Sequence, residues 1–177
     1  MHDHIRLNDD GAISMHIDPA ISISPVGLDI DLDDRRLSHR AASNIACDGS
    51  SLRMAFDGMN VVLHVEHAWD GALFYTVEVE NSSGDDLRLR GISLRLFDGD
   101  WGACGPLCVS SDARVTTYPA ERAYGYDGPR AIADNLPLTS CWFVSVHDPR
   151  TLRNIATGAY DAPSGFVRFH VVPLQSH

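Results

Sequence analysis

Residues 71–99 read GALFYTVEVENSSGDDLRLRGISLRLFDG, and this stretch decides the fold class. Polar and apolar side chains alternate in its first half, where the apolar set is Leu73, Tyr75, Val77 and Val79. The alternation returns after the polar segment 81–86, with Leu87, Leu89, Ile92, Leu94 and Leu96. Period-two patterning on β-branched and aromatic residues is typical of half-buried strands. We therefore predict an antiparallel hairpin whose turn lies at 81–86.

The rest of the chain carries two similar signals, alternating segments and Asp-Gly turns. Asp and Gly both tolerate the positive φ of tight hairpin turns, and Asp-Gly pairs occur at 10–11, 48–49, 57–58, 70–71, 98–99 and 127–128. Alternation predicts strands at 12–17, 20–24, 26–32, 52–56, 60–69, 106–110, 113–118, 141–147, 153–160 and 165–172. Residues 33–46 fit either a short helix or a loop, because helical spacing separates Leu37, Ala41 and Ile45.

Closely spaced turns with almost no helical pattern are typical of all-β sandwiches and barrels. The segments 60–69, 72–81 and 86–97 follow one another and predict an antiparallel meander of hairpins. The fold class that we predict is an all-β antiparallel β-sandwich. At 177 residues a chain buries roughly 70% of its unfolded surface. We predict a single β-sandwich domain over residues 1–177.

The charge of the chain excludes some classes of partner. The formal net charge is −10, and an acidic surface repels phosphate backbones and anionic lipids, so we predict no nucleic-acid and no membrane partner. The sequence has no apolar run of about 18 residues and no signal-peptide pattern at its start. Its four cysteines fit reduced thiols better than a disulfide framework. We therefore predict a cytoplasmic location.

Metal and cofactor signatures are weak. Three residues separate Cys104 from Cys108, whereas paired zinc ligands favour about two and need a second pair. His64 and His67 would point to opposite faces of one strand. The common nucleophile, zinc-protease and nucleotide-binding motifs do not occur. We predict neither a metal site nor a cofactor.

The segment 101–137 breaks the strand pattern and is rich in Gly, Pro and aromatic residues. Long irregular segments in compact β domains are more often functional than idle. Flat aromatic rings beside polar groups suit the apolar faces and hydroxyl edges of sugars. The predicted ligand-binding residues are Trp101, Tyr124, Tyr126, Asp127, Trp142 and His147. In the alternative interpretation these rings cover an open end of the sandwich or pack against another subunit.

Three features together resemble a known family: the Asn-Ser-Ser-Gly-Asp turn, the aromatic segment, and the later phrase WFVSVHDPRTLRNIATGAY. They resemble the N-terminal β-supersandwich (galactose-mutarotase-like) domain of family 36-type α-galactosidases, the melibiase-like glycoside hydrolases. In that family an aromatic strand precedes an Asp-Pro…Gly phrase, here Asp148-Pro149…Gly158. The resemblance covers roughly residues 50–170.

The resemblance implies a supporting role. In such enzymes the catalytic residues belong to a (β/α)₈ barrel that follows this domain, and the domain supports the barrel and oligomer contacts. The loop 123–128 stands where those relatives carry a Gly-Tyr-Gln-Ser-Trp-like phrase, but Gln, Ser and Trp are missing here. Aldose 1-epimerases share the supersandwich, yet their paired catalytic His and Glu motifs are not recognisable in this sequence.

We therefore predict a non-catalytic, carbohydrate-associated β-sandwich module, an accessory or remnant N-terminal domain of a glycoside hydrolase. Its predicted partners are a saccharide and either a second copy of the chain or a catalytic barrel. Two alternatives stay open. One is a small stand-alone sugar-active enzyme, an epimerase or a lyase, that uses the 101–137 loop and His147. The other is a structural protein-interaction module that pairs through exposed strand edges.

Overall fold

A computed structural model describes residues 3–18, 21–69, 72–95, 112–117, 127–131, 138–141, 143–150, 152–159 and 168–171. Most of these residues lie in β-strands, and the sheets are antiparallel. The all-β, sandwich-like class predicted from the sequence is therefore confirmed. The described residues group into two compact units, one over residues 3–95 and one over residues 112–171. The single domain and the supersandwich subclass stay predictions.

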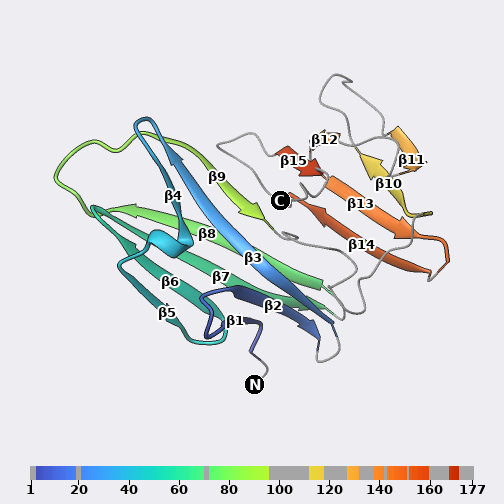
Figure 1. The fold of residues 1–177 in the computed structure, drawn as a ribbon, viewed down its shortest axis with the longest axis horizontal. Helices are drawn as coiled ribbons and strands as arrows, with labels where there is room; N and C mark the ends of the chain where they lie inside the picture. Colours follow the sequence, from blue (N-terminus) through green and yellow to red (C-terminus); the bar gives the residue numbers. More distant parts are fainter. Residues whose placement is uncertain are drawn as a thin grey trace. The chain divides into compact units, whose positions relative to one another are not determined.

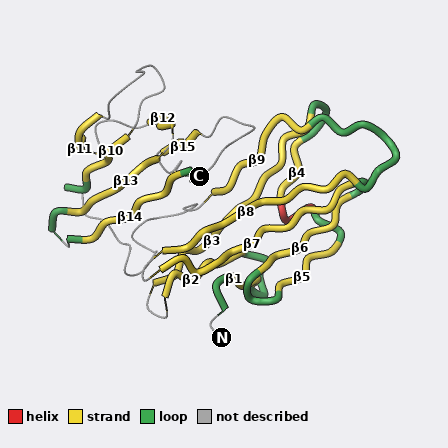
Figure 2. Tube along the Cα trace, turned by 180° about the vertical axis from the view of Figure 1, so that it is seen from behind, coloured by secondary structure: helices red, strands yellow, loops and turns green. Residues whose placement is uncertain are grey.

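The first unit contains two sheets (Figure 1). The five-stranded sheet consists of β1 (Ile5–Leu7), β2 (Ile13–Asp18), β3 (Ile21–Leu32), β4 (Arg36–Ser38) and β9 (Leu89–Arg95). The four-stranded sheet has the order β5 (Asn44–Cys47), β6 (Ser51–Phe56), β7 (Met59–Trp69) and β8 (Ala72–Asn81). The long strand β3 crosses over β7 and β8, and Figure 2 shows the same two layers from behind.

The core of this unit follows the alternation of the sequence. Every second residue of the central strands is fully buried, including Met15, Leu28, Ile30, Leu52, Val61, Leu63 and Val65. The intervening residues of β6 and β7 are mostly half-buried or exposed, as at Arg53. Because side chains alternate between the two faces of a strand, one apolar face of each sheet packs into a shared interior. The predicted strands at 12–17, 52–56 and 60–69 are confirmed, whereas those predicted at 20–24 and 26–32 form one continuous strand, β3.

The segment 33–46 is neither a helix nor a plain loop. It contains β4, one turn of 3₁₀-helix (η1, His39–Ala41) and β5. Ser38 caps the turn, since its Oγ accepts a hydrogen bond from the Arg40 amide at 3.1 Å. Strand β4 forms because its backbone pairs with β3, where Ile30 lies opposite Leu37. The helical spacing of three apolar residues was therefore incidental.

The hairpin predicted at 71–99 is wrong in its second half. Strand β8 pairs with β7 over its whole length, as predicted, but β9 pairs with β3, where Leu94 lies opposite Leu28. The polar segment after β8 thus carries the chain from one sheet to the other. The amides of Ser82 and Ser83 each donate to the Gly58 carbonyl at 3.0 Å, which fixes this crossing to the β6–β7 turn. The meander that does form is β5–β6–β7–β8.

Four of the Asp-Gly pairs lie in the described residues, and three of them form turns, as predicted. Gly11, Gly49 and Gly58 have φ of 76°, 88° and 76° and follow β1, β5 and β6. Gly58 belongs to a two-residue connection, because Phe56 pairs directly with Met59. At the fourth position the prediction is wrong, since residues 127–128 begin a strand. The pairs at 70–71 and 98–99 lie outside the described residues.

The second unit contains two smaller sheets. One has the order β11 (Asp127–Ala131), β10 (Arg114–Thr117), β13 (Phe143–Asp148) and β14 (Arg153–Gly158). The other pairs β12 (Leu138–Cys141) with β15 (Arg168–Val171). The single strand predicted at 141–147 is thus two strands in different sheets. Strands β10, β14 and β15 confirm the predictions at 113–118, 153–160 and 165–172, and 106–110 lies outside the described residues.

Candidate functional site

The sequence-predicted ligand site falls mostly outside the described residues. This holds for Trp101, Tyr124, Tyr126 and Trp142. Asp127 is described only in its backbone, at the start of β11 opposite Thr117. His147 is exposed on β13, in register with Arg114 of β10 and Asn154 of β14. An aromatic sugar site in this region stays a prediction.

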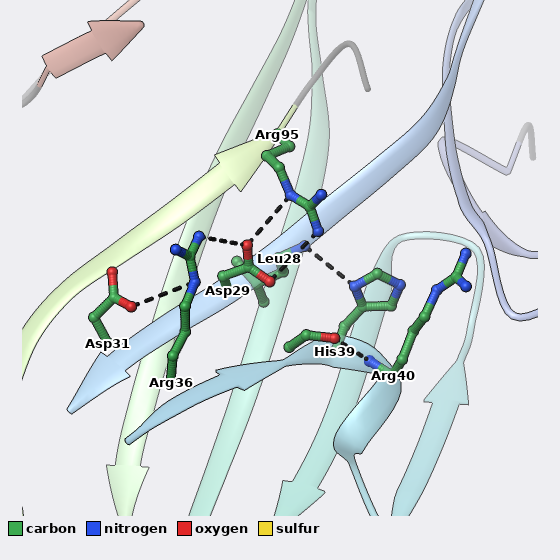
Figure 3. Close-up of polar contacts among 8 residues, drawn as sticks. Leu28, Asp29, Asp31, Arg36, His39, Arg40 and Arg95 are labelled. Atoms are coloured by element: carbon green, nitrogen blue, oxygen red, sulfur yellow. Dashed lines mark hydrogen bonds and ion pairs between the residues drawn. The ribbon is translucent and has the colours of Figure 1, made fainter. Parts of the chain in front are cut away.

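The described residues hold a different charged cluster, on the outer face of the five-stranded sheet (Figure 3). We define the Asp29 cluster as Asp29, Asp31, Arg36, His39, Arg40 and Arg95. Leu28 and Ile30 of β3 are buried in the core, so Asp29 between them faces away from it. Its side chain is nevertheless only 6% exposed. A buried carboxylate is costly unless it is paired and hydrogen-bonded.

Two arginines from the flanking strands neutralise Asp29. Arg36 of β4 donates from Nη2 to Oδ2 at 2.8 Å, and Nε of Arg95 on β9 lies 3.3 Å from the same oxygen. Nη2 of Arg95 reaches Oδ1 at 3.5 Å. The carboxylate therefore lies between two arginines. These come from strands on either side of β3 that are far apart in the sequence.

Small residues on the neighbouring strand positions leave space for these two guanidinium groups. Asp29 is in register with Ser38 of β4 and Ser93 of β9, and Gly27 is in register with Arg95. A Cβ atom at Gly27 would lie 2.8 Å from Nε and Nη2 of Arg95. A side chain at this position would displace the guanidinium group, which lies against the β3 backbone.

Arg36 connects the buried carboxylate to an exposed one. Its Nε lies 3.5 Å from Oδ1 of Asp31, whose side chain is 37% exposed. The hydrogen bond to Asp29, followed by the charges of Asp29 and Asp31, raises the pKa of Arg36 above its usual range. Both carboxylates hold the guanidinium group of Arg36. Its side chain is 60% exposed, so it also faces solvent.

His39 lies beside the cluster with only 3% of its surface exposed. The Leu28 amide donates to its Nδ1 at 3.3 Å, so a neutral ring carries its proton on Nε2. Nε2 makes no hydrogen bond of standard geometry to a described residue, although the Gly11 backbone lies near. Burial, and then the charge of Arg40, lower the pKa of His39 below its ordinary value of 6.5. We conclude that the ring is neutral at neutral pH.

This histidine gives a testable pH dependence. Its folded-state pKa lies below 6.5, so in the interval below 6.5 the unfolded chain binds the proton and the folded chain does not. The stabilisation is complete above that value and is lost as the pH falls toward the folded-state pKa. We expect the free energy of unfolding, measured by urea denaturation, to decrease from about pH 7.5 to about pH 5.5, and the decrease to be smaller in His39→Gln.

His16 provides the comparison for this experiment. Burial, and then the charge of Arg6, also lower the pKa of His16, so part of the slope should survive in His39→Gln. The double variant His16→Gln/His39→Gln should be flatter still. A His39→Gln slope equal to that of the unmodified protein would show that His39 takes up its proton equally in both states.

A second polar cluster lies on the four-stranded sheet. His64 Nδ1 lies 3.1 Å from Oγ of Ser51, and His64 Nε2 lies 3.5 Å from Oε2 of Glu78. A serine, an imidazole and a carboxylate that contact one another in this order resemble a nucleophile–base pair. Ser51 is only 5% exposed, however, and its amide donates to Asp48. We interpret the three residues as a cross-strand hydrogen-bond ladder.

Within the described residues, no group of three or more His, Cys, Asp or Glu side chains could hold a metal ion. Cys47 is exposed and Cys141 is buried, and both are free thiols. Cys104 and Cys108 lie outside the described residues.

Comparisons with known proteins found no protein-family model, curated protein or solved structure that matches this chain. The resemblance to family 36-type α-galactosidases therefore stays a prediction from the sequence. Across the described part of the chain, no helix is long and apolar enough to cross a membrane. The Asp29 cluster is a polar site of this protein that residues from β3, β4 and β9 form together.

Proposed function

We propose that this protein is a non-catalytic, carbohydrate-associated β-sandwich module and that the Asp29 cluster contributes its saccharide contact. The observation that carries the proposal is a pair of adjacent, solvent-facing groups of opposite hydrogen-bonding type. Asp31 accepts and Arg36 donates, and their side chains are 37% and 60% exposed. Sugar hydroxyl groups both donate and accept, so neighbouring hydroxyls can bond to such a pair.

Rigidity supports the proposal. A long side chain usually loses rotamer freedom when it binds a ligand, at a cost of about 0.5–1.5 kcal/mol. Arg36 has already lost this freedom, because Asp29 and Asp31 hold its guanidinium group in the unbound protein. Sites that are fixed before binding recognise ligands more tightly.

The surface beside Asp31 also has room for a ring. Gly91 of β9 lies opposite Asp31, and a Cβ atom added there would meet no atom within 4 Å. Ser93, two residues further along β9, is also small. A flat ligand could therefore lie along β9 and reach both Asp31 and Arg36.

The wider biological setting is part of the same proposal. The resemblance in sequence supports a link to glycoside hydrolases, with a catalytic barrel or a second copy of the chain as protein partner. The two free thiols, Cys47 and Cys141, are consistent with a reducing cytoplasm.

A saccharide panel tests the proposal. Calorimetric or NMR titration should detect binding of at least one galactose-, glucose- or mannose-containing oligosaccharide. Arg36→Gln should weaken it about tenfold or more, the loss expected for a hydrogen bond from a charged donor. Arg53→Gln is the matched control, because Arg53 is an equally exposed, ion-paired arginine (62% exposed) on the other sheet.

Two other outcomes would decide against the proposal as stated. If no saccharide in the panel binds, the carbohydrate function is wrong. If binding occurs but Arg36→Gln leaves it unchanged while Tyr126→Ala abolishes it, the contact lies in the aromatic segment 101–137 and not at the Asp29 cluster.

A further inference from the structure

His39 is the only buried residue of the segment 33–50, all of which the structure describes. Only 3% of its surface is exposed, whereas the other residues of this segment are half-buried or exposed. Residues that anchor a segment to a core are usually aliphatic, because a buried polar side chain costs free energy. Here a titratable side chain has that position, and it fixes β4 and η1 to the five-stranded sheet.

Hydrogen bonds to other strands mark the ends of the part that His39 holds. At one end the Asp33 amide donates to the Arg88 carbonyl at 3.2 Å. At the other end the amide and the hydroxyl of Ser43 donate to the Ala55 carbonyl, at 2.8 Å and 3.0 Å. We define the β4–η1 segment as the residues between these two ends, 34–42. Within it, the three residues of β4 pair with β3, and one turn of 3₁₀-helix follows.

The ring of His39 lies against the backbone of two other elements. Its Nδ1 accepts from the Leu28 amide of β3 at 3.3 Å. The backbone of Gly11, in the turn before β2, lies near the ring, and Nε2 is buried without a hydrogen bond of standard geometry to a described residue. The bond from Leu28 requires a lone pair on Nδ1, so only a ring that is unprotonated at this atom can accept it.

Among the described residues, the charged groups that act on the ring are two cations, Arg40 of η1 and Arg95 of β9 (Figure 3). Burial, and then Arg40, lower the pKa of His39, and they outweigh the backbones of Leu28 and Gly11, which raise it. A protonated ring is therefore less stable in this position than in water. The other charged residues on the elements around the ring are Asp29 and Asp31 on β3, Arg36 on β4, and Asp9 and Asp10 in the turn before β2.

We propose that protonation of His39 releases the β4–η1 segment from β3 while the other strands of the first unit stay paired. The charged ring cannot accept from Leu28, and its charge is hydrated once it leaves the interior. Strand β4 lies at the end of its sheet and pairs with β3 through three residues only. Its release frees the edge of β3 at residues 29–31 and removes Arg36 from Asp29. The release is independent of the proposed carbohydrate function, because it requires no ligand.

Amide hydrogen exchange of the full chain tests the proposal. Exchange rates would be measured by NMR at about pH 7.5 and about pH 5.5 and converted to protection factors. The two reporter amides are those of Leu28, which donates to His39, and Leu32, which donates to the Arg35 carbonyl at 2.8 Å. Their protection should fall about threefold to tenfold at the lower pH. Tenfold is roughly the limit for one proton bound by a ring that titrates near 6.5 after release.

Urea distinguishes this local opening from unfolding of the whole unit. A local opening exposes little surface, so low urea concentrations should hardly change the exchange of Leu28 and Leu32. The reference is the Val65 amide on the other sheet, which donates to the Ser50 carbonyl at 2.8 Å. It should be better protected than both reporter amides and should depend steeply on urea.

Two variants assign the pH effect to His39. His39→Gln keeps an amide group that can accept from Leu28 but does not titrate, so the fall in protection should disappear. His16→Gln is the matched control, because burial also lowers the pKa of His16 and this residue lies on β2, outside the segment; here the fall should remain.

If His39→Gln does not fold, Ser38→Ala replaces it. This variant removes the cap of η1 and should lower the protection of Leu28 about twofold or more at both pH values, as expected for a lost cap. Unchanged protection of Leu28 in Ser38→Ala would show that the segment does not open as a unit.

Three further results would overturn the proposal. The first is protection of the reporter amides that does not change with pH. The second is a fall that persists in His39→Gln. The third is a urea dependence at Leu28 equal to that at Val65, which would show that the ring takes up its proton only when the whole unit unfolds.

Discussion

Replacing Asp29 by asparagine is expected to lower the free energy of unfolding by about 2–3 kcal/mol, measured by urea denaturation, because charge-assisted hydrogen bonds are lost and a buried amide faces other donors. The carboxylate is nearly inaccessible and accepts from both Arg36 and Arg95. An asparagine NH₂ group in its place would point at a guanidinium group. The two arginines can reach water, so the loss is smaller than for a fully buried ion pair.

Asp31→Asn is the matched control for this experiment. It removes a charge from the same strand, the same face and the same arginine, but its side chain is 37% exposed and its contact with Arg36 is 3.5 Å long. Exposed ion pairs contribute about 0–1 kcal/mol, so the variant should stay within that range. Equal losses from Asp29→Asn and Asp31→Asn would contradict the view that burial makes Asp29 important.

A double-mutant cycle separates the pair from its surroundings. Asp29→Asn and Arg36→Gln should show a coupling energy of about 0.5–3 kcal/mol, the range for residues in one hydrogen-bond network. The pair of Asp29→Asn with Arg53→Gln should be additive, because Arg53 lies on the other sheet.

The alternation of the sequence predicts the buried faces of β3, β6 and β7 because that information is local. Leu28 and Ile30 are apolar, and Asp29 and Asp31 between them are polar, so the alternation alone places the first pair inside. The partner of a strand is different, because the same alternation fits any neighbouring strand whose buried face matches. For this reason the regular pattern of β9 predicts pairing with β8, whereas in the structure β9 pairs with β3.

The Asp29 cluster could not be predicted for a related reason. An aspartate at an alternating polar position looks solvated, and nothing near Asp29 in the sequence shows that it is covered. Arg36 lies 7 residues away and Arg95 lies 66 residues away, so the cluster exists only once β4 and β9 have docked on β3. Gly27 was the one local signal, since glycine inside a strand indicates close approach by another group.

For the predicted aromatic site, the sequence indicates the residue types but not their placement. Its residues were chosen for their chemistry, but a site requires their side chains to converge. Of the six, the structure describes the side chain of His147 alone, which is exposed on a regular strand. Composition can nominate residue types for sugar binding, whereas only tertiary placement can bring them together.

Truncating Ile30 to alanine is expected to cost about 2–5 kcal/mol of unfolding free energy, the range measured for large-to-small substitutions in packed cores. Ile30 is 0% exposed and lies in the middle of β3, paired with Leu37 of β4 and Ile92 of β9. Its side chain belongs to the interior between the two sheets, while its backbone joins both strands that supply the arginines of the Asp29 cluster.

Ile92→Ala tests the partner of Ile30 on β9, whose side chain is more exposed. Ile92 is 38% exposed, so the same truncation removes less buried surface there and should cost roughly half as much or less, at about 25 cal/mol per Å². A larger loss at Ile92 than at Ile30 would contradict the described sheet, in which β3 is internal and β9 borders it. If the order holds, β3 is the strand on which both faces depend: Ile30 anchors it in the core, and Asp29 on the opposite face uses that rigidity to fix Arg36 and Arg95.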